Sequence, residues 1–219
     1  MENQALKFID EQKRNRYARI LVFACFFMYV MMMGSKNAYT AEVVAIQDVF
    51  GKNKTEVSLA MTFYFVTYAI MQVILASFMG RLNLKIYLTV TVLTSSILTV
   101  LIAYSPTLEL IYLICAVNGA LQAGVYSGCM AVLSKYLPKS MLPFANTMIT
   151  LGSAVAGGIS YGVPALCVSL GRWDMPFIVL GIIFFVSGVI FFYACSVMSK
   201  FPPLLAENNS DSRESKVEK

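Results

Sequence analysis

Apolar residues in this chain gather in long blocks that short polar stretches separate. A helix needs about 20 apolar residues to cross a hydrocarbon layer of roughly 30 Å, and the blocks are of that length. The strands of a membrane β-barrel would alternate apolar and polar residues over about 10 positions, which these blocks do not do. The pattern predicts an all-α membrane protein with six transmembrane helices, near residues 17–34, 57–79, 86–104, 108–133, 144–170 and 176–198.

The composition agrees with a membrane protein. The 219 residues are 58% hydrophobic and 13% charged, whereas soluble domains are usually about 45–50% apolar and about 25% charged. The mean hydropathy is +0.69. We expect a cytoplasmic N-terminal arm at 1–16, a six-helix membrane domain at 17–199, and a flexible cytoplasmic tail or linker at 200–219. The arm is not expected to be a cleaved signal peptide, because its basic residues lead into a longer span.

Basic residues are distributed unevenly among the segments that connect the blocks. Cytoplasmic loops of membrane proteins carry an excess of Lys and Arg. We therefore expect a multi-pass protein of the cell membrane with both ends in the cytoplasm. The net charge of +5 follows from this asymmetry and does not indicate a nucleic-acid partner. The basic residues on the expected cytoplasmic side are Lys7, Lys13, Arg14, Arg16, Arg19, Arg81, Lys85, Lys135, Lys139, Lys200, Arg213, Lys216 and Lys219.

Polar side chains recur every four residues in the second and fourth blocks, which places them on one face of each helix. Such side chains usually turn toward the bundle interior or a wet cavity. The third and sixth blocks hold little beyond Ser and Thr, which can bond to their own helix, so we expect them to lie outside a cavity that the other four surround. The polar groups are Lys36, Asn37 and Tyr39; Tyr64, Tyr68 and Gln72; Asn118, Gln122 and Tyr126; and Asn146, Thr150 and Ser153.

Other interpretations of these polar residues stay open. Amides in membrane helices also bond across helices, at roughly 0.6 kcal/mol each, and tyrosines often mark the membrane interface. Lys36 either faces a cavity or extends its amine to the outer surface. Close helix packing is expected at two GxxxG patterns, Gly124 with Gly128 and Gly158 with Gly162.

The residue content gives no support to an enzyme. The chain has no histidine, and its five cysteines all lie inside apolar blocks without a CxxC pair, as small core residues do. No metal cluster, nucleophile–base pair or paired intramembrane carboxylates are present in the sequence. We expect neither a metal nor a cofactor. Glu42 is the only acid near a polar group and is a weak candidate for a coupling proton.

The six spans, the basic segment after the second span and the polar face resemble the N-terminal half of a major facilitator superfamily transporter. In "ASFMGRLNLK", Arg81 and Lys85 match the cytoplasmic signature of that superfamily, whereas Ala76, Gly80 and Asn83 depart from it. The resemblance implies two inverted repeats of three helices, secondary active transport, and a gating role for the loop that carries Arg81 and Lys85.

Two shorter stretches resemble the organophosphate:phosphate antiporter branch. "NGALQAGVYSG" is similar through Asn118, Gly119 and Gln122, and "GSKNAY" through Lys36 and Asn37, with Ser35 where that branch has arginine. The resemblance implies that the first helix continues past Gly34 and that Lys36 faces a central cavity holding a small organic anion.

A facilitator has about twelve spans and binds solute between its two halves. We therefore expect this chain to be an N-terminal half or truncated form, with the lipid bilayer, an anionic solute, and a second six-helix half or another copy as partners. The alternatives are a six-span substrate-binding subunit of a vitamin importer, or a fragment that does not transport.

Overall fold

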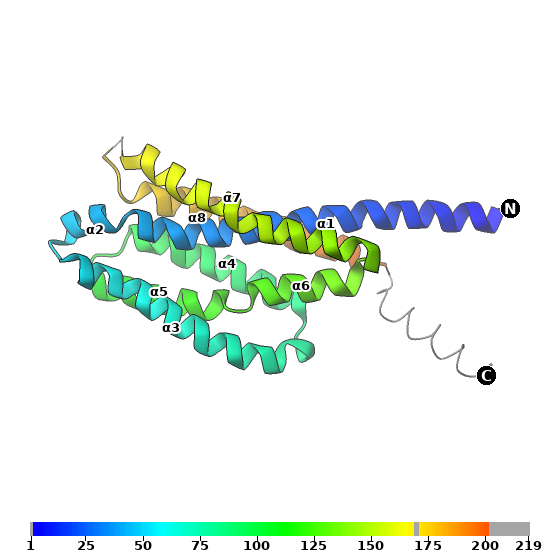
Figure 1. Cartoon of the computed structure of the whole chain (residues 1–219), viewed down its shortest axis with the longest axis horizontal. Coiled ribbons are helices and arrows are strands. Elements are labelled where there is room, and N and C mark those ends of the chain that lie inside the picture. Colours follow the sequence, from blue (N-terminus) through cyan, green and yellow to red (C-terminus); the bar gives the residue numbers. More distant parts are fainter. Residues whose placement is uncertain (1, 169–170, 202–219) are drawn as a thin grey trace.

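The computed structural model describes residues 2–168 and 171–201, and all regular structure in that part of the chain is helical (Figure 1). Six of the helical segments are long and apolar enough to cross a membrane, which confirms the predicted spans. The elements are α1 (Glu2–Ala41), α2 (Val43–Phe50), α3 (Lys54–Phe78), η1 (Met79–Arg81), α4 (Leu84–Ala103), α5 (Leu108–Gln122), α6 (Val125–Tyr136), η2 (Lys139–Met141), α7 (Leu142–Val168) and α8 (Met175–Met198).

The pattern of helix packing has an internal symmetry. α1 packs mainly against α7 and α8, α3 packs against α5, and α4 packs against α8 and α5. The six spans are, in order, α1, α3, α4, α5 with α6, α7 and α8. If the first three are exchanged with the last three, α1 takes the place of α5, α3 that of α7 and α4 that of α8. The α1–α7 contact then becomes the α5–α3 contact, and the α1–α8 contact becomes the α5–α4 contact. The α4–α8 contact maps onto itself. This is the pattern of two inverted three-helix repeats, as expected for half of a facilitator fold.

The first span is longer than its apolar block. α1 continues to Ala41 and α2 follows after Glu42, so the prediction that the helix does not stop at Gly34 is confirmed. At the other end, the helix begins at Glu2, and no break separates residues 2–16 from the span. Gly51, with φ of 61°, ends α2, and Asn53 begins α3 through a capping box with Glu56. The expected tail beyond Phe201 lies outside the described residues.

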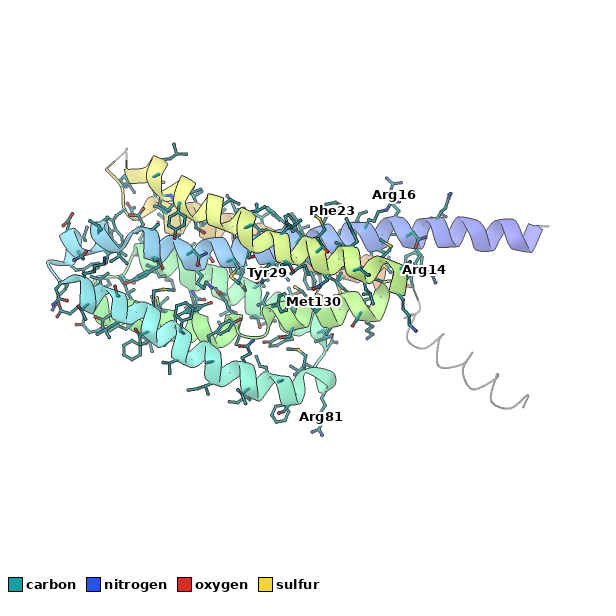
Figure 2. All side chains as sticks on the ribbon, in the orientation of Figure 1. Arg14, Arg16, Phe23, Tyr29, Arg81 and Met130 are labelled. Atoms are coloured by element: carbon teal, nitrogen blue, oxygen red, sulfur yellow. The ribbon has the colours of Figure 1, made fainter. Side chains whose placement is uncertain are left out.

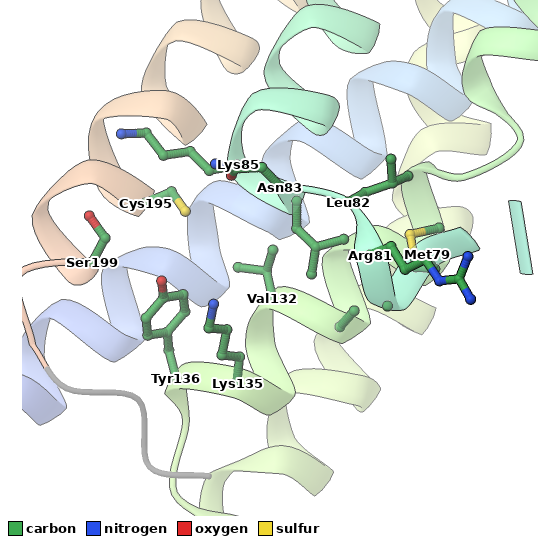
Figure 3. A pocket seen from close by; sticks show the side chains of 13 residues that line it. Met79, Arg81, Leu82, Asn83, Lys85, Val132, Lys135, Tyr136, Cys195 and Ser199 are labelled. Carbon is green, nitrogen blue, oxygen red and sulfur yellow. The ribbon is translucent and has the colours of Figure 1, made fainter. Parts of the chain in front are cut away.

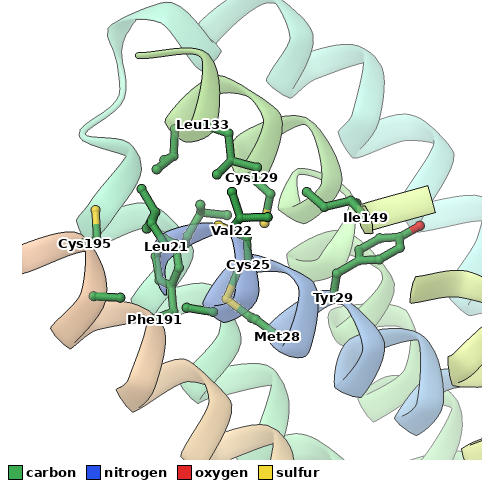
Figure 4. Packing of buried hydrophobic residues seen from close by; sticks show 14 of the residues in the cluster. Leu21, Val22, Cys25, Met28, Tyr29, Cys129, Leu133, Ile149, Phe191 and Cys195 are labelled. Atoms are coloured by element: carbon green, nitrogen blue, oxygen red, sulfur yellow. The ribbon is translucent and has the colours of Figure 1, made fainter. Parts of the chain in front are cut away.

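The core is centred on α1. Its side chains pack with those of α6, α7 and α8 in a cluster that includes Leu21, Cys25, Met28, Cys129 and Phe191 (Figure 4). All five cysteines are buried free thiols, which agrees with their expected role as small core residues. α1 therefore serves as the central support of the bundle.

Two helices are far less covered. In the most apolar window of each span, 67% of the α1 residues are buried, against 17% for the α3 span and 28% for the α7 span. The glycines agree with this difference. A Cβ at Gly128 would lie 2.7 Å from Leu88, whereas no atom lies within 4 Å of one at Gly158 or Gly162. The expectation of close packing holds for the fourth span and is wrong for α7 within the described chain, because that face is open.

Candidate functional site

Five buried polar side chains from α3, α4 and α5 form a hydrogen-bonded chain, which we call the amide network. Tyr64 donates from Oη to Gln122 Oε1 at 2.7 Å, and Gln122 donates from Nε2 to Ser95 Oγ at 2.7 Å. Ser95 donates from Oγ to Asn118 Oδ1 at 2.6 Å, and Asn118 Nδ2 lies 3.5 Å from Thr99 Oγ1. The two amides thus find partners inside the bundle, as buried polar groups usually do.

A narrow crevice of about 20 Å³ lies beside the amide network, with walls from α1, α3, α4 and α5. This volume holds about one water molecule. Lys36 lines the crevice from α1, is half-buried, and places Nζ 5.6 Å from the ring centroid of Phe65. Tyr39 also lines it and donates from Oη to the Val57 carbonyl at 2.9 Å, which ties α1 to the start of α3. Among the sequence candidates, the crevice brings together Lys36, Tyr39, Tyr64, Asn118 and Gln122.

Lys36 has no salt bridge to any acidic side chain that the structure describes. A desolvated cation without a counter-ion is costly, and its attraction for an anion grows as the local dielectric falls. The crevice can therefore offer a positive charge beside fixed hydroxyl and amide groups. This arrangement suits an anion better than a cation or a neutral solute.

The remaining tyrosine candidates lie next to the crevice. Tyr68 stacks on Tyr64, with ring centroids 6.0 Å apart and an interplanar angle of 19°. Tyr126 is partly exposed and contacts Tyr29 of α1, with centroids 5.7 Å apart. Figure 2 shows Tyr29 midway along the bundle. The fourth span is interrupted after Gln122, because α5 ends there and α6 begins at Val125, so Tyr126 does not continue the face of the two amides.

Three other candidates stand apart from the crevice walls. Gln72 on α3 and Asn146 on α7 are exposed, and Asn37 on α1 is half-buried. Thr150 donates to the Asn146 carbonyl and Ser153 to the Thr150 carbonyl, so the hydroxyls of the α7 stripe bond to their own helix. Apart from Asn37, these polar groups lie on α3 and α7, the two helices that the bundle leaves most open.

The sequence interpretation missed the contribution of α4. Ser95 and Thr99 lie in the amide network, so the expectation that the third span sits outside the polar interior is wrong. Thr99 also donates from Oγ1 to the Ser95 carbonyl of its own helix at 2.9 Å. The residue composition of α4 therefore does not show whether its hydroxyls also bond to another helix. Tyr29 was also missed, although it precedes Lys36 by seven residues and therefore shares its helix face.

The gating-loop candidates lie far from the crevice. Arg81 ends η1 and is exposed, and Lys85 lies in the first turn of α4 and is half-buried. Arg14, Arg16 and Arg81 lie toward the same end of the bundle (Figure 2). We call this the basic end, and it also carries η2 and the end of α8.

Glu42 is the residue at which α1 passes into α2. Its φ of −92° and ψ of 4° differ from helical values. Its side chain is 1% exposed, and neither carboxylate oxygen has a hydrogen-bond partner in the part of the chain that the structure describes. An unpaired buried charge is costly. Glu42 is therefore better suited to hold a proton than to remain charged.

Comparison with known proteins decides the family. The model of the Major Facilitator Superfamily matches residues 22–216, which is most of the chain. The chain belongs to the Major Facilitator Superfamily. Membership makes it a multi-pass membrane protein and points to a transporter, not an enzyme. It also gives no support to the vitamin-importer alternative.

Two curated transporters are similar in sequence. The MFS-type transporter cnsO of Penicillium expansum is 28% identical over 171 residues, which are 74% of this chain and 33% of that protein. The uncharacterized transporter YybO of Bacillus subtilis (strain 168) is 25% identical over 146 residues, which are 67% of this chain and 34% of that protein. The chain thus aligns with about a third of the length of these transporters.

A solved facilitator structure has the same fold. It is a bacterial homolog of the human lysosomal transporter Spinster, in an inward-facing and unoccupied conformation. The TM-score is 0.72 at 16% sequence identity, and the match covers 81% of this chain and 43% of the other. The six helices therefore correspond to half of a facilitator fold.

Proposed function

We propose that this chain contributes one half of a secondary active transporter for a small organic anion, and that Lys36 provides the charge that attracts the anion. The observation that carries the proposal is the half-buried Lys36 in the crevice, without a salt bridge among the described side chains. The resemblance of the Lys36–Asn37 stretch to the organophosphate:phosphate antiporter branch supports the same chemistry. Ser35 in place of that branch's arginine leaves one cation fewer for a phosphate ester.

The other candidate residues either line the crevice beside Lys36 or lie next to it. Tyr39, Tyr64, Asn118 and Gln122 line the crevice. The amide network fixes the last three, and the hydrogen bond to the Val57 carbonyl fixes Tyr39. The site extends toward the open side of the bundle through Asn37, Tyr68, Gln72, Tyr126 and Asn146. On this proposal the network holds the shape of the site, and the less buried residues provide free hydrogen-bond groups.

A crevice of about 20 Å³ is too small for an organic anion, so the site needs a second wall. The open faces of α3 and α7 offer the surface for it, since few of their residues are buried. We propose that a second six-helix unit covers these faces and that the anion binds between the two units, as in other inverted-repeat transporters. The unit is either another polypeptide region or a second copy of this chain.

The distribution of basic residues supports an orientation in the cell membrane with the basic end in the cytoplasm. On this proposal the crevice lies toward the outer half of the membrane. Arg81 and Lys85 then lie on the cytoplasmic side, where they take part in gating.

Anion binding tests the proposal directly. The transporter, with its second six-helix unit, would be reconstituted in lipid nanodiscs, and binding of radiolabelled glycerol phosphate and of small carboxylates would be measured by equilibrium dialysis. Lys36→Ala is expected to abolish binding, and Lys36→Arg to retain part of it, because the charge persists while its geometry changes. Lys52→Ala removes an exposed lysine paired with Glu56 at 3.9 Å and is the matched control. Equal binding by wild type and Lys36→Ala would contradict the proposal.

A further inference from the structure

A second, larger cavity lies at the basic end of the bundle. It has a volume of about 720 Å³ and is bounded by η1, the first turn of α4, the last turn of α6 and the end of α8 (Figure 3). We call it the basic pocket. It belongs neither to the crevice nor to the amide network, although Arg81 and Lys85 in its walls are the residues proposed above to take part in gating.

Cations line the basic pocket without any acidic residue. Arg81, Lys85 and Lys135 contribute to its walls, and Asn83, Tyr136 and Ser199 add uncharged hydrogen-bond groups. The acidic side chains that the structure describes lie toward the opposite end, around α2 and at the starts of α3, α5 and α8: Glu42, Asp48, Glu56, Glu109 and Asp174. None of them can neutralise the pocket.

Gly80, one of the positions that depart from the superfamily signature, lies in the wall of this pocket. A Cβ at Gly80 would meet no heavy atom within 4 Å, so there is room for a larger side chain. Among the described side chains, the positive charge of the pocket is therefore uncompensated because of the residue type and not for lack of space. Such a charge needs an anion from outside the described residues.

One side of the basic pocket borders the surface that faces lipid. The Lys85 ammonium lies 4.5 Å from the ring centroid of Phe192 on α8. Phe192 is 44% exposed, and nearby apolar positions, Val189 at 49% and Ile86 at 55%, are exposed as well. In a bilayer these side chains contact acyl chains. A molecule with an anionic head and apolar chains fits both surfaces at once.

We infer that the basic pocket binds the phosphate group of an anionic phospholipid. Lys135 pairs with the phosphate, and Tyr136 and Ser199 hydrogen-bond to its ester oxygens or to the head group. Arg81 and Lys85, whose charged ends lie on opposite sides of the pocket (Figure 3), add positive charge that attracts the anion. The acyl chains lie along the exposed apolar side chains of α4 and α8. Basic pockets between transmembrane helices are a known way to bind such head groups.

The inference is tested with the full chain in nanodiscs of phosphatidylcholine with or without phosphatidylglycerol. Retained lipids are identified by native mass spectrometry after transfer to detergent. The variant R81Q/K85Q/K135Q is expected to bind phosphatidylglycerol more weakly by a factor on the order of 100, about fivefold for each cation removed. The control K13Q/R16Q/K139Q removes the same charge from the basic end outside the pocket and is expected to retain the lipid.

Two further arms make the result decisive. Exposed Lys135 is changed alone, to Gln or to Arg, so that a folded variant remains available if the triple variant does not fold; Gln is expected to reduce retention and Arg to preserve it. Soluble glycerol phosphate is offered to the protein in phosphatidylcholine alone. Binding of this ester that R81Q/K85Q/K135Q loses and Lys36→Ala keeps, without retention of phosphatidylglycerol, would keep the phosphate site but make its ligand a soluble anion. Equal retention by the pocket variants and the control would overturn the site.

Discussion

Alanine at Gly119 is expected to push α3 and α5 apart. A Cβ there would collide with the Tyr64 carbonyl oxygen and lie 2.9 Å from its carbonyl carbon. Both are backbone atoms, which cannot rotate away as a side chain does. The same contact surface holds the hydrogen bond from Thr67 Oγ1 to the Ala116 carbonyl at 2.7 Å, which a separation of the helices would lengthen.

The size of the effect follows from two opposing contributions. Overpacking usually costs about 1–3 kcal/mol, and alanine gains up to about 1 kcal/mol over glycine in helix propensity. Because the collision at Gly119 involves backbone atoms, we expect the overpacking cost to lie in the upper part of the range of about 1–3 kcal/mol. The free energy of unfolding should then fall by about 1–2 kcal/mol. At Gly158 no atom lies within 4 Å of the added Cβ, so Gly158→Ala keeps only the propensity gain.

The buried cysteines provide the assay. All five are free and buried, so a thiol-reactive fluorophore should label them only as the protein unfolds. Gly119→Ala is expected to lower the midpoint of thermal unfolding in detergent, and Gly158→Ala to leave it equal or higher. Equal midpoints for the two variants would refute the close approach of α3 and α5 at Gly119.

Three other substitutions test separate features. Tyr64→Phe removes the donor to Gln122 and should cost about 0.6 kcal/mol, measured by the same unfolding assay; no loss would mean that the hydrogen bond does not hold the helices. Glu42→Gln should unfold near the wild-type midpoint below the unfolded carboxyl pKa of about 4.3 and increasingly above it as the pH rises toward neutral, because the unfolded wild-type carboxyl then ionises while the buried one stays protonated; a constant difference would count against a buried, protonated Glu42. The Arg172 guanidinium lowers the pKa of Asp174 through hydrogen bonds of 2.9 and 2.6 Å. Stability from this pair is therefore present above the unfolded carboxyl pKa of about 3.9 and lost as the pH falls through the folded value. Arg172→Ala should lie below wild type at neutral pH and converge with it in acid, and a constant difference would count against the pair.

The sequence predicts the spans and the helix connectivity well, because the length of an apolar block is set by the thickness of the hydrocarbon layer. It also predicts that Lys36, Asn118 and Gln122 lie close together, because these residues are costly in lipid and must turn inward. The same physics explains the buried cysteines. These features depend on the type of each residue and its spacing along a single helix.

Features that depend on a partner helix are less predictable. Ser95 and Thr99 carry hydroxyls that bond equally well to their own helix or to a neighbour, so the sequence does not predict which hydrogen-bond partner they take. The break after Gln122 has no proline to mark it. Asn146 lies on an exposed face of α7, because the described chain provides no neighbour for that face. These outcomes are decided by tertiary packing.

The inverted arrangement also has a consequence for biosynthesis. α1 packs mainly against α7 and α8, and the distance from Ala41 to Leu142 is about 100 residues of chain. At about 5–20 residues per second, the ribosome needs roughly 5–20 s to make that stretch. During this time α1, with Lys36 near its C-terminal end, is in the membrane without its final neighbours. α1 is thus made before the other described helices but is among the last of them to be fully packed, and the insertion machinery or a chaperone has to shelter it in the interval.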